Sequence, residues 1–324
     1  MIQKLRDRIN RVFVGKEEVV DHVLTCLLAG GHVLLEDVPG VGKTTLAKTL
    51  AAAINCSFGR IQFTPDTLPS DVTGLYVYNQ KTSEFDYRQG PVMSQVLLAD
   101  EINRTSPKTQ ASLLEAMAEG QVTVDGTRHP LPELFFVIAT QNPIEYLGTY
   151  PLPEAQLDRF MMRLKVGYPS PEAELLMARN FLSREDNASS ANGIEGVCDT
   201  ADVLRMRREV ADVHVSEGVL GYIGEIIDLT RQEKQFALGA SPRALLALVR
   251  ASQARAYLHG NDFIRPDDVR DVSVNVLHHR LILSEEARMA AADADSLVSA
   301  TGRKARIPRG EIISAGPRGG KPSG

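Results

Sequence analysis

The chain of 324 residues has only three cysteines, no long hydrophobic run and little excess of charge of either sign. Cys26, Cys56 and Cys198 lie far apart and form no Cys-x-x-Cys pair, which argues against a disulfide framework or a zinc site. The richest apolar stretch, from Val23 to Leu35, is interrupted by glycine and histidine and falls short of the roughly 18 apolar residues that a membrane span needs. The starting sequence MIQKLRDRIN lacks the apolar core of a secretion signal, so we expect a cytoplasmic protein.

The charged residues are 36 Lys and Arg against 41 Asp and Glu, a formal net charge of −5. This mild acidity argues against a protein that coats nucleic acid or an anionic membrane, although a local basic channel is compatible with it. Hydrophobic residues make up 43% of the chain and charged residues 24%, which excludes disorder throughout and allows a sizeable core. At roughly 150 residues per domain, the length favours two domains.

From Gly31 to about Val166, short β-rich apolar runs alternate with helical patterns, as in a parallel sheet covered by helices. Two further segments, Leu75–Arg88 and Gln121–Leu131, predict inserted β-hairpins, the second around a favoured Asp-Gly turn. The five strands that we predict for the sheet are His32–Glu36, Arg60–Phe63, Gln95–Ala99, Leu134–Thr140 and Met162–Val166.

After Pro169 the β-rich runs disappear and helical spacing takes over. We predict helices at Glu172–Phe181, Val203–Val213, Gly218–Arg231, Pro242–Leu258 and Pro266–Leu281. The expected fold class is therefore α/β, with a five-stranded parallel sheet domain over residues 1–168 and a smaller all-helical domain over residues 169–300. Residues 301–324 are basic and rich in Gly and Pro, which predicts a disordered tail.

The segment HVLLEDVPGVGKTTLAKTL places a buried strand before a turn rich in Pro and Gly and a helix that opens at Lys43. Gly40 and Gly42 let backbone N–H groups converge on phosphate oxygens, and the helix N-terminus adds its partial positive charge. Lys43 can reach the terminal phosphates, and the Thr44 hydroxyl is placed to ligate Mg²⁺. The segment therefore predicts a site for a nucleoside triphosphate.

The same loop supplies other expected contacts with the nucleotide, from Pro39, Val41 and Thr45. The strict phosphate-loop pattern begins with Gly, whereas Asp37 stands at that position here. The loop can still close, because the two glycines nearest the phosphates supply the permissive backbone.

Downstream, SQVLLADEINR sets Asp100 and Glu101 at the end of a continuous apolar strand. The carboxyl ends of parallel strands open into the crevice where ligands bind. We expect Asp100 to hold Mg²⁺ and Glu101 to orient and polarise the attacking water, since phosphoryl transfer needs both a metal holder and a water-positioning group. The next strand ends at Asn142, whose neutral amide can bond the γ-phosphate or the water without adding negative charge, or can form an ordinary Asn-Pro turn.

With these segments in this order, the chain resembles the AAA+ ATPases and, within them, is similar to the MoxR family. The resemblance spans roughly Val14 to Leu283 and implies a phosphate-loop AAA+ core followed by a helical lid domain. The segments that carry it are LLEDVPGVGKT, GPVMSQVLLADEINR, TQASLLEAMAEGQVTVDG, VIATQNPIEYLGTYPLPEAQLDRF and GASPRALLALVRASQARAYL.

Position by position, the resemblance implies roles for further residues. Asn142 matches the polar residue called sensor 1, and Arg243, in SPRA, matches the lid arginine called sensor 2. Arg159, in LDRF, matches the arginine finger that acts on the nucleotide of a neighbouring subunit. Val14 and Gly15 match the segment that lines the adenine pocket. The two hairpins match the helix-2 insert and the hairpin before sensor 1.

The resemblance further implies an ATPase that binds ATP and Mg²⁺ and assembles into a ring, with a hexamer as the expected size. It also implies a chaperone-like factor that remodels or matures protein complexes. The expected partners are protein clients and a protein that carries a von Willebrand factor A domain. No membrane span and no nucleic-acid partner are expected.

Three alternatives share these motifs. The first is a nucleic-acid motor, because replicative helicases of the AAA+ class carry the same helix-2 insert. Against it, the hairpin tip Asn79–Glu84 holds only one Lys beside one Glu. Hairpins that bind a phosphate backbone usually carry more cationic side chains. The second is the ATPase subunit of a magnesium chelatase. The third is a nucleotide-gated scaffold that binds ATP and hardly turns it over.

Overall fold

The computed structural model describes residues 1–36, 41–142, 149–182 and 196–308 of the chain. Its centre is a five-stranded sheet in the order β2-β5-β8-β1-β9, in which all neighbouring strands are parallel. The five predicted strands are confirmed with ends that shift by at most two residues, and so is the α/β fold class. These strands are β1 (Val33–Glu36), β2 (Phe58–Gln62), β5 (Val96–Asp100), β8 (Phe136–Gln141) and β9 (Met162–Lys165).

Helices cover both faces of the sheet, so the central strands are apolar on both sides. In β1, Val33 and Leu35 pack into the core on one face, whereas Leu34 packs into the core on the other. The first core includes residues from α1 (Ile2–Val12), α2 (Glu17–Leu28), α3 (Lys43–Ala53) and α9 (Thr200–Ala211). The second includes residues from α4 (Pro69–Thr73), the 3-10 turn η1 (Pro91–Met93) and α5 (Pro107–Glu119).

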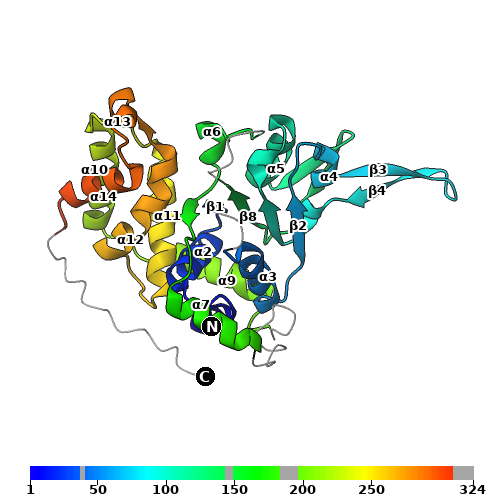
Figure 1. Ribbon diagram of the computed structural model, residues 1–324, viewed down its shortest axis with the longest axis horizontal. Coiled ribbons are helices and arrows are strands. Elements are labelled where there is room, and N and C mark those ends of the chain that lie inside the picture. The colour runs from blue at the N-terminus through cyan, green and yellow to red at the C-terminus, as the bar shows by residue number, and fades with distance from the viewer. Residues whose placement is uncertain (37–40, 143–148, 183–195, 309–324) are drawn as a thin grey trace, which may run out of the picture.

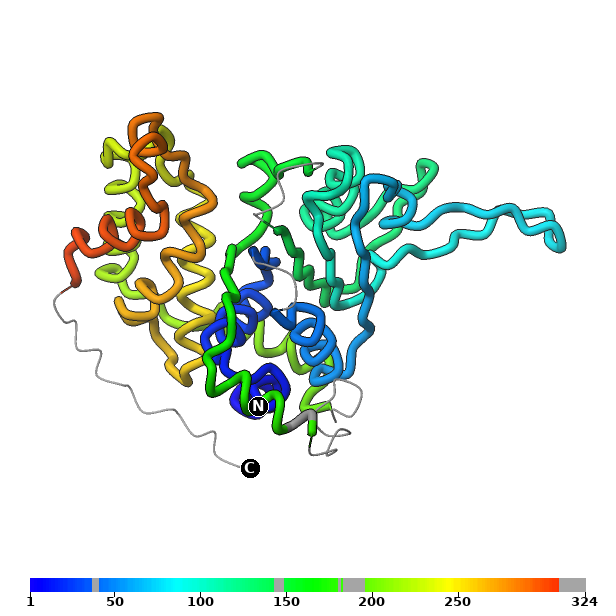
Figure 2. The backbone as a smooth tube through the Cα atoms, in the orientation of Figure 1, coloured from blue at the N-terminus to red at the C-terminus, as the bar shows by residue number. Residues whose placement is uncertain are grey.

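Two antiparallel hairpins extend from the sheet domain, as predicted. The first projects far from the rest of the molecule (Figures 1 and 2). The second turns through Asp125 and Gly126, whose φ angles of 47° and 81° suit a two-residue hairpin turn. Tyr87 of the first hairpin stacks on His129 of the second with ring centroids 3.9 Å apart, so the hairpins touch. Their strands are β3 (Gly74–Asn79), β4 (Glu84–Gln89), β6 (Gln121–Val124) and β7 (Thr127–Pro130).

The carboxyl-terminal part is helical, as expected. It contains α7 (Pro171–Leu182), α10 (Glu217–Gln232), α11 (Pro242–Leu258), α12 (Pro266–Leu277), α13 (Glu285–Met289) and α14 (Ala294–Lys304). α9 packs against α2 of the sheet domain as well as against α11, so the division after residue 168 stays a prediction. The remaining short elements are η2 (Ile102–Arg104), α6 (Glu154–Leu157), β10 (Phe236–Leu238), η4 (His278–Arg280) and β11 (Ile282–Leu283).

Three details of this region were predicted wrongly. The helix expected over Pro266–Leu281 ends at Leu277, where η4 takes over. β10 and β11 form a small antiparallel sheet where no strand was expected. Residues 301–304 were assigned to the tail, but α14 continues to Lys304 and buries Val298 and Thr301. Residues 309–324 of that tail lie outside the described residues. None of the described helices is long and apolar enough to cross a lipid bilayer.

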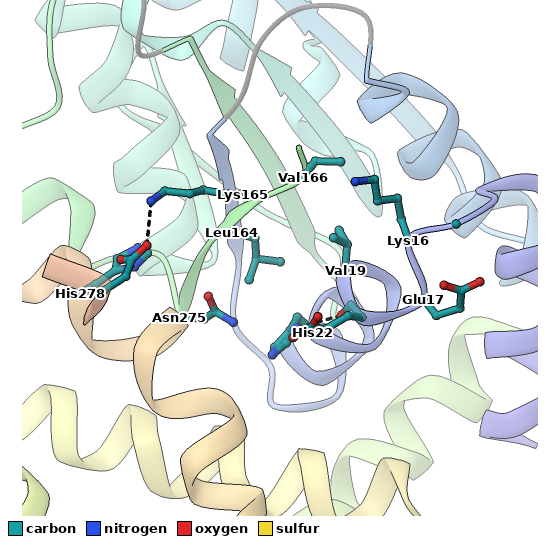
Figure 3. A pocket seen from close by; sticks show the side chains of 12 residues that line it. Lys16, Glu17, Val19, His22, Leu164, Lys165, Val166, Asn275 and His278 are labelled. Atoms are coloured by element: carbon teal, nitrogen blue, oxygen red, sulfur yellow. Dashed lines mark hydrogen bonds and ion pairs between the residues drawn. The ribbon is translucent and has the colours of Figure 1, made fainter. Parts of the chain in front are cut away.

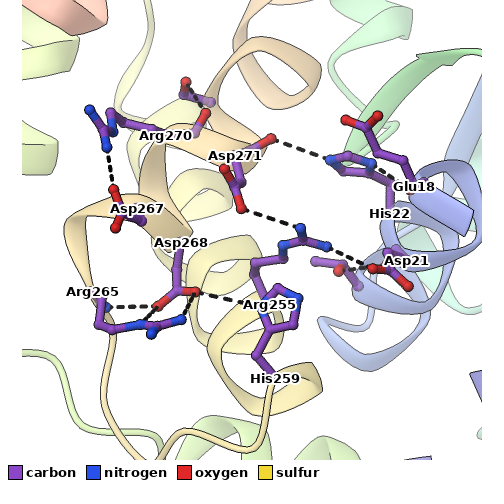
Figure 4. A network of polar contacts seen from close by, with 12 residues as sticks. Glu18, Asp21, His22, Arg255, His259, Arg265, Asp267, Asp268, Arg270 and Asp271 are labelled. Carbon is purple, nitrogen blue, oxygen red and sulfur yellow. Dashed lines mark hydrogen bonds and ion pairs between the residues drawn. The ribbon is translucent and has the colours of Figure 1, made fainter. Parts of the chain in front are cut away.

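A network of ion pairs joins the sheet domain to the helical part (Figure 4). Arg255 of α11 places Nη1 3.4 Å from Asp21 Oδ2 in α2 and Nη2 3.2 Å from Asp271 Oδ2 in α12. Arg6 of α1 donates from Nε to Asp21 Oδ1 at 2.5 Å. The side chains of Asp21 and Arg255 are only 4% and 10% exposed, so each relies on its partners to offset the loss of water.

Arg255→Ala should therefore lower the free energy of unfolding by about 3 kcal/mol, because it leaves the buried Asp21 carboxylate with one cation instead of two. Urea unfolding followed by circular dichroism measures this change. Arg250→Ala, on an exposed position of the same helix, should stay within about 0.5 kcal/mol of the unsubstituted chain. A loss below about 1 kcal/mol for Arg255→Ala would contradict the role of this network.

Candidate active site

A cavity of about 400 Å³ opens at the carboxyl ends of β2, β5 and β8, beside the start of α3. We call it the strand-end cavity. The structure therefore brings the glycine turn before α3 and the acid pair at the end of β5 to one place, as they must be if they act on one ligand. Among the described residues, the cavity is lined by Gly42, Lys43, Thr44, Arg60, Gln62, Asp100, Glu101 and Asn142.

The start of α3 forms one wall of this cavity. Gly42, at the N-cap, has a φ of +86°, and a Cβ there would lie 3.1 Å from the ring of Phe13, so both conformation and space favour glycine. The helix begins at Lys43, and the N–H groups of a helix's first turn point out of its N-terminal end. They can bind an anion with the support of the helix dipole, while Lys43 and Thr44 add a cation and a hydroxyl.

Four other loop residues were predicted to contact the nucleotide. Val41 is buried and Thr45 is exposed, and neither is among the described residues that line the strand-end cavity. Pro39 and Gly40, together with the variant position Asp37, lie outside the described residues.

The acid pair is held by the neighbouring strand. The Thr140 hydroxyl of β8 donates to Asp100 Oδ1 at 2.8 Å and accepts the backbone N–H of Glu101 at 2.9 Å. Glu101 has φ +57° and ψ +49°, a left-handed conformation that costs a residue with a side chain about 1–2 kcal/mol. Strain of this kind persists where the surroundings fix it and is common at functional sites. Here it coincides with a carboxylate that lines the cavity.

Two lining residues were missed by the sequence analysis. Arg60 and Gln62 lie at alternate positions of β2, and both side chains reach the acid pair. Arg60 Nη2 donates to Asp100 Oδ2 at 2.8 Å, and Gln62 Nε2 donates to Glu101 Oε2 at 2.8 Å. The available signal was their position: polar residues at the carboxyl end of a strand in a parallel sheet face the same edge as the acids.

Asn142 is placed as predicted, directly after β8 and on the lining of the strand-end cavity. Its backbone carbonyl accepts a hydrogen bond from Asn103 Nδ2 at 3.3 Å. Its amide therefore lies at the same strand edge as Asp100 and Glu101, where it can meet a phosphate or a water.

Arg159 and Arg243 lie elsewhere. Neither is among the described residues that line the strand-end cavity. Arg159 is half-buried and donates from Nη1 to the carbonyl oxygen of Leu114 in α5 at 2.8 Å. Arg243, at the start of α11, is 62% exposed and places Nε 3.3 Å from Asp158 Oδ2. Both arginines thus contact or adjoin the segment around Asp158, and among the described residues neither forms a hydrogen bond or ion pair with Asp100 or Glu101.

A second cavity, of about 410 Å³, lies where α2 and β9 meet α12, η4 and α14, and we call it the α2–α12 cavity (Figure 3). Gly15 lines it, has a φ of +74°, and leaves no room for a Cβ, which would lie 2.5 Å from Ala173 Cβ. Val14 is half-buried just before it. The remaining lining residues are Lys16, Glu17, Glu18, Val19, His22, Leu164, Lys165, Val166, Asn275, His278 and Asp295.

Charged groups on one wall of the α2–α12 cavity join the two parts of the chain. Lys165 Nζ of β9 donates to Asp295 Oδ2 of α14 at 2.7 Å, and His278 Nδ1 lies 2.7 Å from Asp295 Oδ1. The nearby His278 ring and the Lys165 ammonium together hold the pKa of the Asp295 carboxyl well below its usual range. The carboxylate is therefore ionised at neutral pH and stays paired with Lys165.

Comparison with known proteins agrees with this geometry. Residues 32–162 match the family described as ATPase family associated with various cellular activities (AAA), and residues 228–301 match the AAA lid domain. A crystal structure of a protein from Cytophaga hutchinsonii superposes with a TM-score of 0.87 at 39% sequence identity and covers 95% of each chain. The sheet, the phosphate-loop helix, the acid pair and the helical lid thus define an ATPase of the AAA class.

Named relatives identify the family within the AAA class to which the chain is similar. Chaperone MoxR1 of Mycobacterium tuberculosis is 42% identical over 288 residues, which cover 86% of this chain and 75% of the relative. Protein MoxR of Paracoccus denitrificans is 32% identical over 300 residues, 85% of this chain and 87% of the relative. The uncharacterized protein YeaC of Bacillus subtilis is 50% identical over 308 residues, 95% of each. The chain belongs to the MoxR family of AAA+ ATPases.

Lys43→Ala should weaken ATP binding by about 100-fold or more, because it removes a cation whose bonds to phosphate are charge-assisted. Titration of a fluorescent ATP analogue measures the affinity. Lys48→Ala is the matched control, since Lys48 is an exposed lysine on the same helix, and it should bind like the unsubstituted chain. Tight ATP binding by Lys43→Ala would overturn the assignment of the start of α3 to phosphate binding.

Proposed function

We propose that the chain hydrolyses ATP to ADP and phosphate in the strand-end cavity. The observation that carries this proposal is that Lys43, Thr44, Asp100 and Glu101 line one cavity. Catalysis of phosphoryl transfer consists mostly of positioning and of charge stabilisation. Lys43 and the N-terminus of α3 supply positive charge for the phosphates. Asp100 and Glu101 supply two fixed carboxylates that can position a metal and a water.

The donor groups suit a magnesium-bound triphosphate. The Thr44 hydroxyl and the Asp100 carboxylate are hard oxygen ligands of the kind that Mg²⁺ takes, and we assign them to hold it. When bound, Mg²⁺ would neutralise charge on the phosphate oxygens. Lys43, at the start of α3, is assigned to bind the terminal phosphates.

Glu101 is the residue that we assign to orient the attacking water and to accept its proton. Its backbone is fixed by Thr140, and its carboxylate lines the cavity in which the phosphates would lie. Asn142 lies at the same edge and can bond the water or the γ-phosphate through a neutral amide. Both groups would act by holding the water in line with the bond that breaks.

The nucleoside part of ATP is assigned to the α2–α12 cavity. Gly15 lines that cavity and Val14 precedes it, which fits the adenine-pocket role that the family resemblance gives them. Its volume of about 410 Å³ is within the range of small-molecule sites. A nucleotide held in both places would contact the sheet domain and the helical lid at once.

Arg159 is proposed to serve the nucleotide of a neighbouring subunit, and Arg243 to meet a phosphate as the lid arginine called sensor 2. Both lie near Asp158 and are absent from the described lining of their own strand-end cavity. A guanidinium directed at the γ-phosphate raises the rate of hydrolysis by a factor of about 10³–10⁵ in enzymes that use one. An active site that borrows its arginine is complete only in a closed ring, and we propose a hexamer.

The ring is proposed to act on proteins. One relative is named Chaperone MoxR1, and this name supports a chaperone-like role in remodelling or maturing protein complexes. A partner with a von Willebrand factor A domain is proposed from the family resemblance. The net charge of −5 supports a protein client over a nucleic acid.

Glu101→Gln tests the hydrolytic assignment. The amide keeps the shape of the side chain but cannot take a proton, so steady-state release of phosphate should fall by about 100-fold or more while ATP still binds. Release is measured by a coupled phosphate assay and binding by the fluorescent analogue. An unsubstituted chain that is already as slow as Glu101→Gln would contradict the proposal and favour a nucleotide-gated scaffold.

Arg159→Ala tests action between subunits. The variant should bind ATP normally and fail to hydrolyse it, because each site loses the arginine of its neighbour. Mixing it with Glu101→Gln protomers should restore part of the activity, since some interfaces then pair an intact Glu101 with an intact Arg159. Absence of recovery in mixed rings of normal size, checked by native mass spectrometry, would count against the arginine finger.

A further inference from the structure

Strand β2 lies at the edge of the sheet and supports the acid pair from the side opposite Thr140. A single nitrogen of Arg60, Nη2, donates two hydrogen bonds, to Asp100 Oδ2 at 2.8 Å and to Gln62 Oε1 at 2.7 Å. The register places Gln62 directly beside Asp100, and Arg60 lies beside Leu98, so that its longer side chain runs along the strand to the acid. The Asp100 carboxylate is thus bonded on both oxygens, by Thr140 and by Arg60.

The second bond of Arg60 determines which way the Gln62 amide points. A guanidinium can only donate, so the Gln62 oxygen must face Arg60 and the Gln62 NH₂ group must face away from it. That NH₂ group donates to Glu101 Oε2 at 2.8 Å. Arg104 Nε lies 3.3 Å from the same Glu101 oxygen. The chain of contacts from Arg60 through Gln62 therefore ends on the carboxylate that is assigned to the attacking water.

We propose that Arg60 is a positioning residue of the hydrolytic site, acting directly on Asp100 and, through Gln62, on Glu101. The inference rests on the proposed ATP hydrolysis at the strand-end cavity. One side chain thereby orients both acids, so that Asp100 presents a fixed carboxylate to the metal and Glu101 a fixed carboxylate to the water. Without Arg60, the Asp100 carboxylate loses one of its two anchors and the Gln62 amide is free to turn over.

A purely structural role does not account for this arrangement. The Arg60 side chain is 44% exposed, and ion pairs with a half-exposed partner contribute little to folding. β2 is fixed by its backbone pairing with β5 and by the burial of Ile61 and Gly59 between the exposed positions. The same contacts can matter far more for catalysis than for folding, because a displacement of about 1 Å in a catalytic group can cost on the order of 100-fold in rate.

Arg60→Ala in the full-length, assembled protein should lower kcat by about tenfold or more. Affinity for ATP in EDTA should stay within about threefold, since the substitution leaves Lys43 and the start of α3 intact. The gain in ATP affinity on adding Mg²⁺, measured with a fluorescent analogue, should be smaller than in the unsubstituted chain, because Asp100 is no longer fixed. The midpoint of thermal unfolding should stay within about 2 °C.

Two further variants sharpen the test. Arg60→Lys keeps a cation with several donors on one nitrogen, so it should recover part of the lost rate and keep the inference testable should Arg60→Ala fail to fold. Arg60→Ala combined with Gln62→Ala should lose less activity than the product of the two single losses, because the residues act in one chain of contacts. Arg128→Ala, an exposed arginine on β7, is the control and should be fully active.

The inference and the proposed function fail in distinguishable ways. An Arg60→Ala variant with the kcat and the Mg²⁺ response of the unsubstituted chain would overturn the inference, while loss of activity in Glu101→Gln would leave the proposed hydrolysis standing. Loss of ATP binding in EDTA by Arg60→Ala would also overturn it, since Arg60 would then bind phosphate itself. An assembled, unsubstituted chain without hydrolysis would contradict the proposed function instead.

Discussion

The side-chain hydroxyl of Thr140 is the contact on which the geometry of the strand-end cavity depends. It joins the two central strands β5 and β8 at their carboxyl ends, with one bond to the Asp100 carboxylate and one to the backbone of Glu101. Because β5 and β8 are buried on both faces, this bond attaches the acids to strands that are part of both hydrophobic cores. β1 runs beside β8 and leads toward α3, so the same sheet fixes where the phosphate-binding helix begins. The packing of the apolar strands thus fixes the relative positions of the acids and the phosphate-binding helix, and phosphoryl transfer depends on such positioning.

The helical part is attached to the sheet domain at points that also matter for the proposed chemistry. Arg280 of η4, buried against α6, donates from Nε to Asp158 Oδ1 at 2.6 Å and from Nη2 to the carbonyl oxygen of Phe160 at 2.8 Å. It thereby holds both ends of the short segment that carries Arg159. α12, which leads into η4, supplies Asn275 to the α2–α12 cavity. A continuous series of contacts therefore links the proposed nucleoside site to the proposed arginine finger, which is the kind of connection that a ring of cooperating subunits requires.

The sequence predicted what local patterns encode and missed what long-range pairing decides. Lys43 and Thr44 follow from a glycine turn between a strand and a helix, and Asp100 and Glu101 from an apolar strand that ends in acids. Arg60 was missed because alternating polar residues on a strand indicate a solvent-exposed face as readily as a functional site. Only the pairing of β2 with β5 brings Arg60 to the acid pair. The helical extent of α14 was not predicted as far as Lys304, because the basic residues and glycine at its end are typical of a disordered tail, although Val298 and Thr301 have helical spacing. The position of Arg243, beside Asp158, depends on how the lid packs, which no local pattern specifies.

The central claim is that the start of α3 and the acid pair on β5 bind one magnesium-triphosphate. A crystal structure of the Glu101→Gln variant with ATP and Mg²⁺ tests this most directly. The account predicts terminal phosphates between Lys43 and residue 101, with the metal beside Thr44 and Asp100. A nucleotide that binds with its phosphates out of reach of Asp100 would contradict it.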